Sequence, residues 1–227
     1  MIDSIVLVSG GMDSAVTAAI AAAKGPCAFL HVNYGQLTED RELAAFTAIA
    51  DFYKVKKRLV ADIGYLRSVG GSALTDGRIK VPKGELGRKG VPVTYVPFRN
   101  AHLLSIAVSW AEVIGGRDIY IGAVEEDSSG YPDCRRAFFK AFEKAVALGA
   151  AARPAIRIRT PLIALHKAQI IRKGERLGAP LHLTWSCYKS STLACGECDS
   201  CLLRLRGFKE AGVVDPIRYR RQRRSIY

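Results

Sequence analysis

Short apolar runs alternate with segments of helical periodicity along most of the chain. The apolar runs are rich in valine, isoleucine and leucine, which favours buried strands at 5–8, 27–32, 57–60, 118–124 and 157–160. After them, apolar residues recur at the spacing of a helix face, which predicts helices at 15–23, 38–53, 101–114, 133–148 and 165–177. Strands that are separated by helices pair in parallel through right-handed crossovers. The pattern therefore predicts an α/β fold with a doubly wound, parallel five-stranded sheet.

One long segment, 63–94, shows neither the apolar runs of strands nor the spacing of a helix face, and it contains seven glycines. Irregular segments of this length inside a domain are usually functional lids or disordered. We expect a mobile lid, with disorder as the alternative. The predicted domain organisation is a sheet domain at 1–180, a cysteine-rich helical segment at 181–216 that packs on it, and a basic tail at 217–227.

The first predicted strand runs directly into the loop Ser9-Gly10-Gly11-Met12-Asp13-Ser14 and then into an alanine-rich helix. A glycine turn between strand and helix points backbone N–H groups and the positive helix end at an anion, so we expect phosphate here. The loop lacks both the lysine of a GxxxxGK[ST] motif and the spacing GxGxxG. Its pattern, SGGxDS, resembles the pyrophosphate loop of ATP pyrophosphatases. The alternative is a plain turn in which Asp13 and Ser14 complement the first helical turn.

Polar residues also gather after two later strands or loops. Arg99 and Asn100 open the predicted helix at 101–114, where donors can face a phosphate or a carboxylate. The fourth strand is followed by an acidic and hydroxyl-rich stretch at 125–134. In parallel sheets, ligands bind at the carboxyl ends of the strands, which makes both groups candidates. Taken alone, the first group is better explained as a surface pair and the second as a polar turn.

Four of the six cysteines lie close together, at Cys187, Cys195, Cys198 and Cys201. The C-x7-C-x2-C-x2-C spacing lets the thiolates face one ion, and four thiolates form a closed tetrahedral zinc site. Such a site has no open position, so its expected role is structural. An iron–sulfur cluster is the alternative, but no fourth cysteine followed by proline supports it.

The chain has 227 residues and a net charge of +13, much of it from arginines in the last ten residues. The excess of basic residues favours anionic partners such as nucleotides. For the arginine-rich tail, we favour a solvated segment over one that contacts nucleic acid. No apolar run approaches the ~20 residues of a membrane span. No signal or transit peptide is recognisable, so we expect a cytoplasmic protein.

Five motifs in this order, SGGMDS, YVPFRN, SGYPDC, TWSCY and CGECDSC, resemble the 7-cyano-7-deazaguanine synthase family. The resemblance extends from residue 5 to about residue 216 and implies an adenine nucleotide α-hydrolase-like fold. It also implies a reaction in which 7-carboxy-7-deazaguanine and ammonia become 7-cyano-7-deazaguanine. Two ATP molecules activate first the acid and then the amide, with release of AMP and pyrophosphate. The implied assembly is a homodimer, and free ammonia is expected because no glutaminase-like segment is recognisable.

The resemblance also implies roles for individual residues. ATP is expected at Val8, Ser9, Gly10, Gly11, Met12, Asp13, Ser14, His31 and Gly122. The expected catalytic residues are Asp13, Ser14 and Arg99, and the expected substrate contacts are Asn100, Asp127, Tyr131, Asp133 and Cys134. Magnesium would offset the charge of the triphosphate, held by Asp13 or Asp127. Zinc is expected at the four clustered cysteines.

Two residues depart from the family pattern, and two other functions remain open. Phe98 stands where the family usually has glycine, and Ser128 where it often has tyrosine. Both border the expected substrate site. A related adenylating enzyme that acts on tRNA, with the arginine tail on phosphates, is one alternative. A zinc module without enzymatic activity is the other, but it leaves the glycine loop unexplained.

Overall fold

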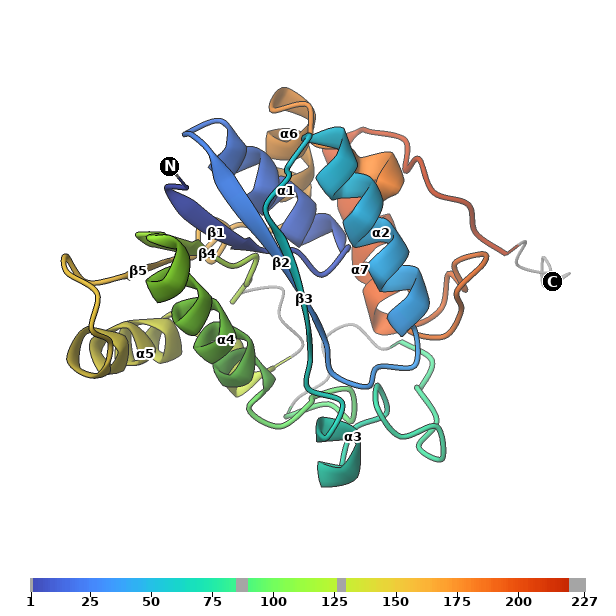
Figure 1. The fold of residues 1–227 in the computed structure, drawn as a ribbon. Coiled ribbons are helices and arrows are strands. Elements are labelled where there is room, and N and C mark those ends of the chain that lie inside the picture. Colours follow the sequence, from blue (N-terminus) through green and yellow to red (C-terminus); the bar gives the residue numbers. More distant parts are fainter. Residues whose placement is uncertain (1, 85–89, 126–129, 221–227) are drawn as a thin grey trace, which may run out of the picture.

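A parallel sheet with the strand order β3-β2-β1-β4-β5 forms the centre of the protein (Figure 1). The structure is a computed structural model, and it describes residues 2–84, 90–125 and 130–220. The strands are β1 (Ser4–Leu7), β2 (Cys27–Asn33), β3 (Arg58–Asp62), β4 (Asp118–Tyr120) and β5 (Arg157–Arg159). All four pairings are parallel, with Val6 opposite Phe29 on one side and Tyr120 on the other. The predicted parallel five-stranded sheet is confirmed.

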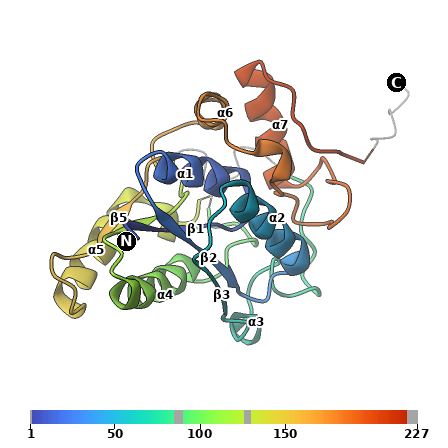
Figure 2. The ribbon, with the colours of Figure 1, turned by 45° about the horizontal axis from the view of Figure 1, so that its top comes forward.

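Helices cover both faces of this sheet (Figures 1 and 2). One face carries α1 (Met12–Ala22), α2 (Glu39–Phe52), α6 (Lys167–Arg176) and α7 (Asp199–Ala211). The other face carries α4 (Arg99–Ile114) and α5 (Arg136–Gly149). Alternate residues of β1 divide between the two cores: Val6 packs under α1, and Ile5 packs under α4. Successive side chains of a strand point to opposite faces of the sheet. Because both faces are covered here, every residue of the strand is apolar or buried, and the sequence shows a continuous apolar run.

Two elements differ from the prediction. The expected strand at 118–124 ends at Tyr120, and its continuation lies in an irregular stretch. The expected helix at 133–148 is divided into a 3₁₀ turn, η1 (Pro132–Cys134), and α5. Arg135 separates them because its backbone is extended, with φ −83° and ψ 145°. The sequence predicted one continuous helix because the aromatic residues of α5 recur at helical spacing, and this pattern does not show the break at Arg135.

The segment 63–94 is partly packed into the protein. It contains the short helix α3 (Leu66–Val69), and Ser72, Ala73, Leu74 and Thr75 are at most 5% exposed. Leu37 donates its N–H to the carbonyl of Leu74 at 2.9 Å. The expected lid therefore has a fixed central part, and its motion stays a prediction.

The cysteine-rich segment lies against the α1 and α2 face of the sheet. It begins with the 3₁₀ turn η2 (Leu181–Leu183) and ends with α7. Phe208 of α7 is 2% exposed and shares a core with Val16 of α1 and Ile171 of α6. Across the described ranges, no helix combines the length and the apolar character needed to cross a bilayer.

Candidate active site and metal centre

One cavity of about 290 Å³ opens at the carboxyl ends of β1, β2 and β4. It brings together residues that the sequence analysis assigned to ATP and to the substrate. The lining residues expected from the sequence are Val8, Ser9, Gly11, Met12, Asp13, Ser14, Arg99, Asn100, Gly122, Tyr131 and Cys134. The lining also includes side chains that the sequence analysis did not assign to the site: Tyr34, Glu42, Lys167, Trp185, Ser186, Tyr188 and Arg204.

The Ser9–Ser14 loop is held in shape by its own hydroxyl groups. Ser14 Oγ donates to the Gly11 carbonyl at 2.8 Å, and the Gly11 N–H donates to Ser9 Oγ at 3.3 Å. Helix α1 follows at Met12, and its N-cap, Gly11, carries no side chain that would cover the first turn. Met12, Asp13 and Ser14 of this turn line the cavity, and the first-turn N–H groups of a helix have no partner within the helix, which suits an anion site.

Two glycines allow neighbouring backbone segments to pack closely against the loop. Gly10 has φ +87°, and a Cβ on it would lie 2.6 Å from the carbonyl oxygen of Glu42. A Cβ on Gly122, after β4, would lie 2.9 Å from the backbone of Asp13. Gly10 itself is covered by α2 and does not line the cavity, whereas Gly122 does.

A lysine from a distant part of the chain completes the loop. Lys167, the first residue of α6, places Nζ 2.6 Å from Asp13 Oδ2. The other oxygen, Asp13 Oδ1, is buried and has no hydrogen-bond partner within the described residues. The Ser9–Ser14 motif itself contains no lysine, so Lys167 was not expected beside it from the sequence. No local pattern in the sequence marks Lys167, because its partner lies 154 positions away along the chain.

Arg99 and Asn100 occupy the first two positions of α4, as expected. Arg99 donates to the Tyr34 hydroxyl at 3.0 Å, and its guanidinium lies 4.9 Å from the centre of the Tyr34 ring. The backbone N–H of Asn100 donates to Asp133 Oδ2 at 2.9 Å, and its side-chain amide donates to the Asp133 carbonyl at 2.9 Å. Asp133 is 3% exposed and lies behind Asn100, so in the structure it fixes the start of α4.

The remaining predicted residues fall into different surroundings. Tyr131 lines the cavity and donates its hydroxyl to Thr94 Oγ1 at 2.9 Å. Burial raises the pKa of the Cys134 thiol to about 11. His31 is 1% exposed and lies behind Val8, whose carbonyl is 2.9 Å from His31 Nδ1. Its contact with adenosine stays a prediction, and Asp127 and Ser128 lie outside the described residues.

The C-terminal segment closes one side of the cavity through the TWSCY motif and α7. Trp185, Ser186 and Tyr188 line it on either side of Cys187. Arg204 of α7 is 2% exposed, donates to both carboxylate oxygens of Asp215 at 2.9 Å, and also donates to Thr184 Oγ1 at 2.8 Å. The sequence analysis missed this arginine because nothing in its local spacing separates it from the other basic residues of the helix.

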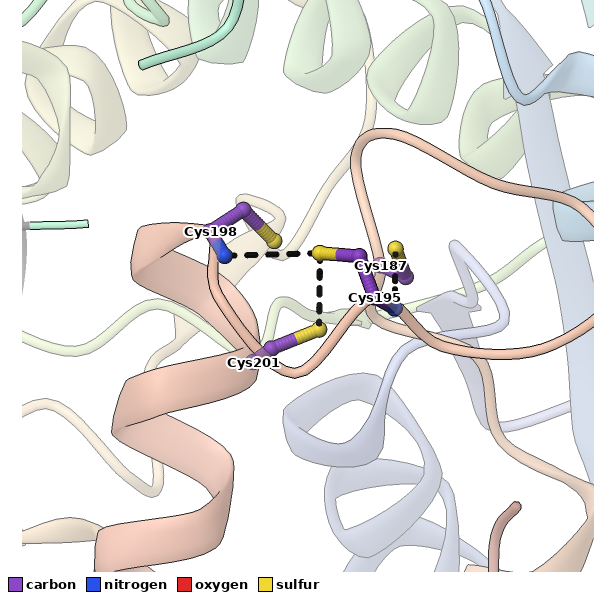
Figure 3. Close-up of side chains that lie close together, drawn as sticks. All are labelled: Cys187, Cys195, Cys198 and Cys201. Carbon is purple, nitrogen blue, oxygen red and sulfur yellow. Dashed lines mark hydrogen bonds between the residues drawn. The ribbon is translucent and has the colours of Figure 1, made fainter. Parts of the chain in front are cut away.

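The four cysteines meet in one cluster beside this wall (Figure 3). Their Sγ atoms all lie within 4.8 Å of one another, and those of Cys195 and Cys201 are 3.8 Å apart. Sulfurs at about 2.3 Å around a tetrahedral zinc are about 3.8 Å apart, so the donor set fits zinc. Figure 3 shows the sulfurs converging between a loop and the start of α7. The cluster is therefore a candidate closed metal site.

Backbone N–H groups surround these sulfurs. Cys187 Sγ accepts from the N–H of Cys195 at 3.3 Å and of Lys189 at 3.4 Å, and Cys195 Sγ accepts from Cys198 at 3.4 Å. Hydrogen bonds from neighbouring thiols and these backbone groups lower the pKa of Cys187. Donors aimed at sulfur stabilise thiolates, which is the form that binds metal.

The chain is similar to known proteins over nearly its whole length. Residues 3–212 match the family described as "Queuosine biosynthesis protein QueC". A protein of Chlorobium phaeobacteroides named 7-cyano-7-deazaguanine synthase is 56% identical over 217 residues, which cover 95% of this chain and 96% of the relative. A protein of the same name from Chloroherpeton thalassium is 55% identical over 218 residues and covers 96% of both chains. The structure of an NMN synthetase from Francisella tularensis aligns with a TM-score of 0.48 and 17% identity over 93% of this chain and 73% of its own. The chain belongs to the QueC family of queuosine biosynthesis proteins.

Proposed function

We propose that the protein converts 7-carboxy-7-deazaguanine and ammonia into 7-cyano-7-deazaguanine at the expense of ATP. Family membership and the shared name of the relatives support this reaction. The observation that carries it is a single cavity lined both by the Ser9–Ser14 loop and by Arg99. An ATP phosphate on the loop would then lie in the same enclosure as an acid held by the arginine.

In the first half of the reaction, a carboxylate oxygen of the substrate attacks the α-phosphorus of ATP, and pyrophosphate leaves. Ammonia then attacks the acyl carbon, and AMP leaves as the amide loses a proton. In the second half, the amide oxygen attacks the α-phosphorus of another ATP, pyrophosphate leaves, and the amide nitrogen loses a proton. Loss of AMP and a proton from that adenylate forms the nitrile. Each half uses the same two parts of the cavity, so one site serves both.

The charges around the loop suit a departing pyrophosphate. Lys167 and the free N–H groups at the start of α1 would stabilise the negative charge that develops on the leaving group. Asp13 Oδ1, which is buried beside them, is suited to hold Mg²⁺, which would neutralise part of the phosphate charge. Arg99 would hold the substrate carboxylate through its fork of donors.

Zinc at Cys187, Cys195, Cys198 and Cys201 would have a structural role, because four thiolates leave no open position. Bound there, it would fix the loop that carries Trp185 and Tyr188 against the cavity. We also propose a cytoplasmic location and small-molecule substrates only. We propose a homodimer as well, which light scattering on the purified protein checks.

Mass spectrometry with purified protein, 7-carboxy-7-deazaguanine, ATP and ammonium salt tests the proposal. The expected products are the amide, then the nitrile, and two AMP for each nitrile. A reaction without ammonia should stop at the adenylate with pyrophosphate release. If neither amide nor nitrile forms and no AMP appears, the proposed function is wrong.

A further inference from the structure

Glu42, in the first turn of α2, is a carboxylate of the cavity that neither the sequence analysis nor the proposed reaction uses. In the described part of the chain, the carboxylates on the cavity lining are Asp13 and Glu42. Asp13 is engaged by Lys167 beside the loop. Glu42 lies near the carboxyl end of β2, where Tyr34 also lines the cavity. The cavity thus has a second acidic side chain besides Asp13.

The Glu42 carboxylate is held in one orientation by neutral groups. Oε1 accepts from the Thr38 hydroxyl at 2.7 Å, and Oε2 accepts from the Gln36 amide at 3.2 Å. The Gln36 side chain is itself fixed, because its carbonyl oxygen accepts from the N–H of Tyr34 at 2.8 Å. Gln36 and Thr38 are 3% and 6% exposed. Each carboxylate oxygen keeps a further lone pair, so the group can accept two more hydrogen bonds.

These neutral partners form no ion pair with the Glu42 carboxylate. No Lys, Arg or His of the described residues forms an ion pair with it, and burial raises its pKa. Arg99 is close enough to act on it electrostatically, but donates its hydrogen bond to the Tyr34 hydroxyl. A partly buried carboxylate without a donor for its free lone pairs is unfavourable. A ligand that brings two adjacent N–H groups would satisfy it.

We propose that Glu42 recognises the N1–H and 2-amino edge of the deazaguanine ring. The inference rests on the proposed function and deepens it. Two parallel N–H groups on a planar ring match the two oxygens of a carboxylate, as an arginine fork does. The substrate would then be read at both ends, with Arg99 on its carboxyl group and Glu42 on its pyrimidine edge. The adenine of ATP offers only one exocyclic amino group beside ring acceptors, and so fits this carboxylate less well.

Binding of two ligands tests this without relying on turnover. Calorimetry with wild-type protein compares 7-carboxy-7-deazaguanine with the analogue that lacks the 2-amino group, which removes one N–H donor from the edge. We expect the analogue to bind about 10- to 100-fold more weakly, because a charged acceptor loses its partner. Equal affinity for the two ligands would overturn the inference, and this comparison needs no variant.

The variant Glu42→Gln should bring the two ligands to within about threefold of each other and weaken the natural one, with an unchanged KM for ATP. Glu39→Gln, in the same helical turn but off the cavity lining, is the matched control and should keep the full preference. Thermal melting checks that both variants fold. A raised KM for ATP with the preference intact would assign Glu42 to the nucleotide and overturn the proposal. If the wild-type protein discriminates between the ligands and Glu42→Gln loses this preference, but no nitrile forms, the proposed reaction fails and the role of Glu42 stands.

Discussion

Lys167 Nζ and Asp13 Oδ2 are 2.6 Å apart, although 154 residues separate them along the chain. The contact joins the start of α6 to the start of α1 at the edge of the phosphate loop. It leaves Asp13 Oδ1 buried without a hydrogen-bond partner within the described residues. A cation and an acceptor with a free oxygen therefore lie side by side where ATP is proposed to bind. Bound phosphate would compete with Asp13 for the lysine and leave the carboxylate available to Mg²⁺.

Replacement of Lys167 by methionine should lower AMP formation about 10²- to 10³-fold, the usual effect of removing one group that stabilises developing charge. The loss should appear mainly in kcat, because the lysine acts on the leaving pyrophosphate. Steady-state AMP release measures it. Lys173→Met, in the last turn of the same helix, is the control and should keep activity. An unchanged kcat in Lys167→Met would show that the lysine does not stabilise the leaving pyrophosphate.

The sheet and the loop were predictable, whereas this contact was not. Strands such as Ser4–Leu7 and Cys27–Asn33 are covered on both faces, and this leaves continuous apolar runs in the sequence. The loop is recognisable in the sequence by its glycines. At Gly10 the glycine is required, because a Cβ there would clash with the backbone of Glu42. Lys167 and Arg204 carry no such local mark. Their partners lie on other elements, and only the packing of α6 and α7 brings them to the cavity.

Replacement of Gly10 by alanine should disable the loop. The residue has φ +87°, and the new Cβ would lie 2.6 Å from the backbone oxygen of Glu42, which cannot move without shifting α2. Gly178→Ala is a matched control, because φ is +64° there but no atom lies within 4 Å of the Cβ. We expect loss of ATP binding by calorimetry in the first variant and only about 1–2 kcal/mol of lost stability in the second. Equal effects of the two substitutions would mean that the positive φ alone, and not the contact with Glu42, causes the loss.

Cys134 should react slowly with alkylating reagents despite lining the cavity. Burial, together with the charge of Asp133, raises its pKa to about 11, so about one thiol in a thousand is ionised at pH 8. Because the thiolate is the reactive form, the rate should rise about tenfold for each pH unit between 7 and 9. Peptide mapping after iodoacetamide treatment measures it.

Added ATP and deazaguanine acid should protect Cys134 but not Cys27, whose pKa is also raised to about 11 by burial away from the cavity. Cys27 therefore serves as the internal reference in the same digest. Labelling of Cys134 at the rate of an exposed thiol, independent of pH, would contradict the buried environment.

Arg204→Met should destabilise the protein strongly. The guanidinium is buried against Asp215, and its removal leaves a carboxylate that is 7% exposed without its cation. Breaking one side of a buried pair costs about 3–5 kcal/mol. Urea unfolding measures the change. Lys209→Met on the same helix is the control, since its side chain is exposed and surface substitutions usually change stability by about 0.5 kcal/mol or less.

Zinc removal should affect stability first and the cavity second. Four thiolates would leave a bound zinc no open ligand position, so we expect it to take no part in the reaction. Cys187 nevertheless lies between Ser186 and Tyr188, which both line the cavity. Cys198→Ser should therefore lose zinc and melt at a lower temperature, and its remaining folded fraction should bind the deazaguanine acid more weakly. Metal analysis, thermal melting and calorimetry on the same preparation measure the three effects. Cys134→Ser, outside the cluster, should keep its zinc. A Cys198 variant that stays folded and retains zinc, but forms no AMP, would show that the metal centre has more than a structural role.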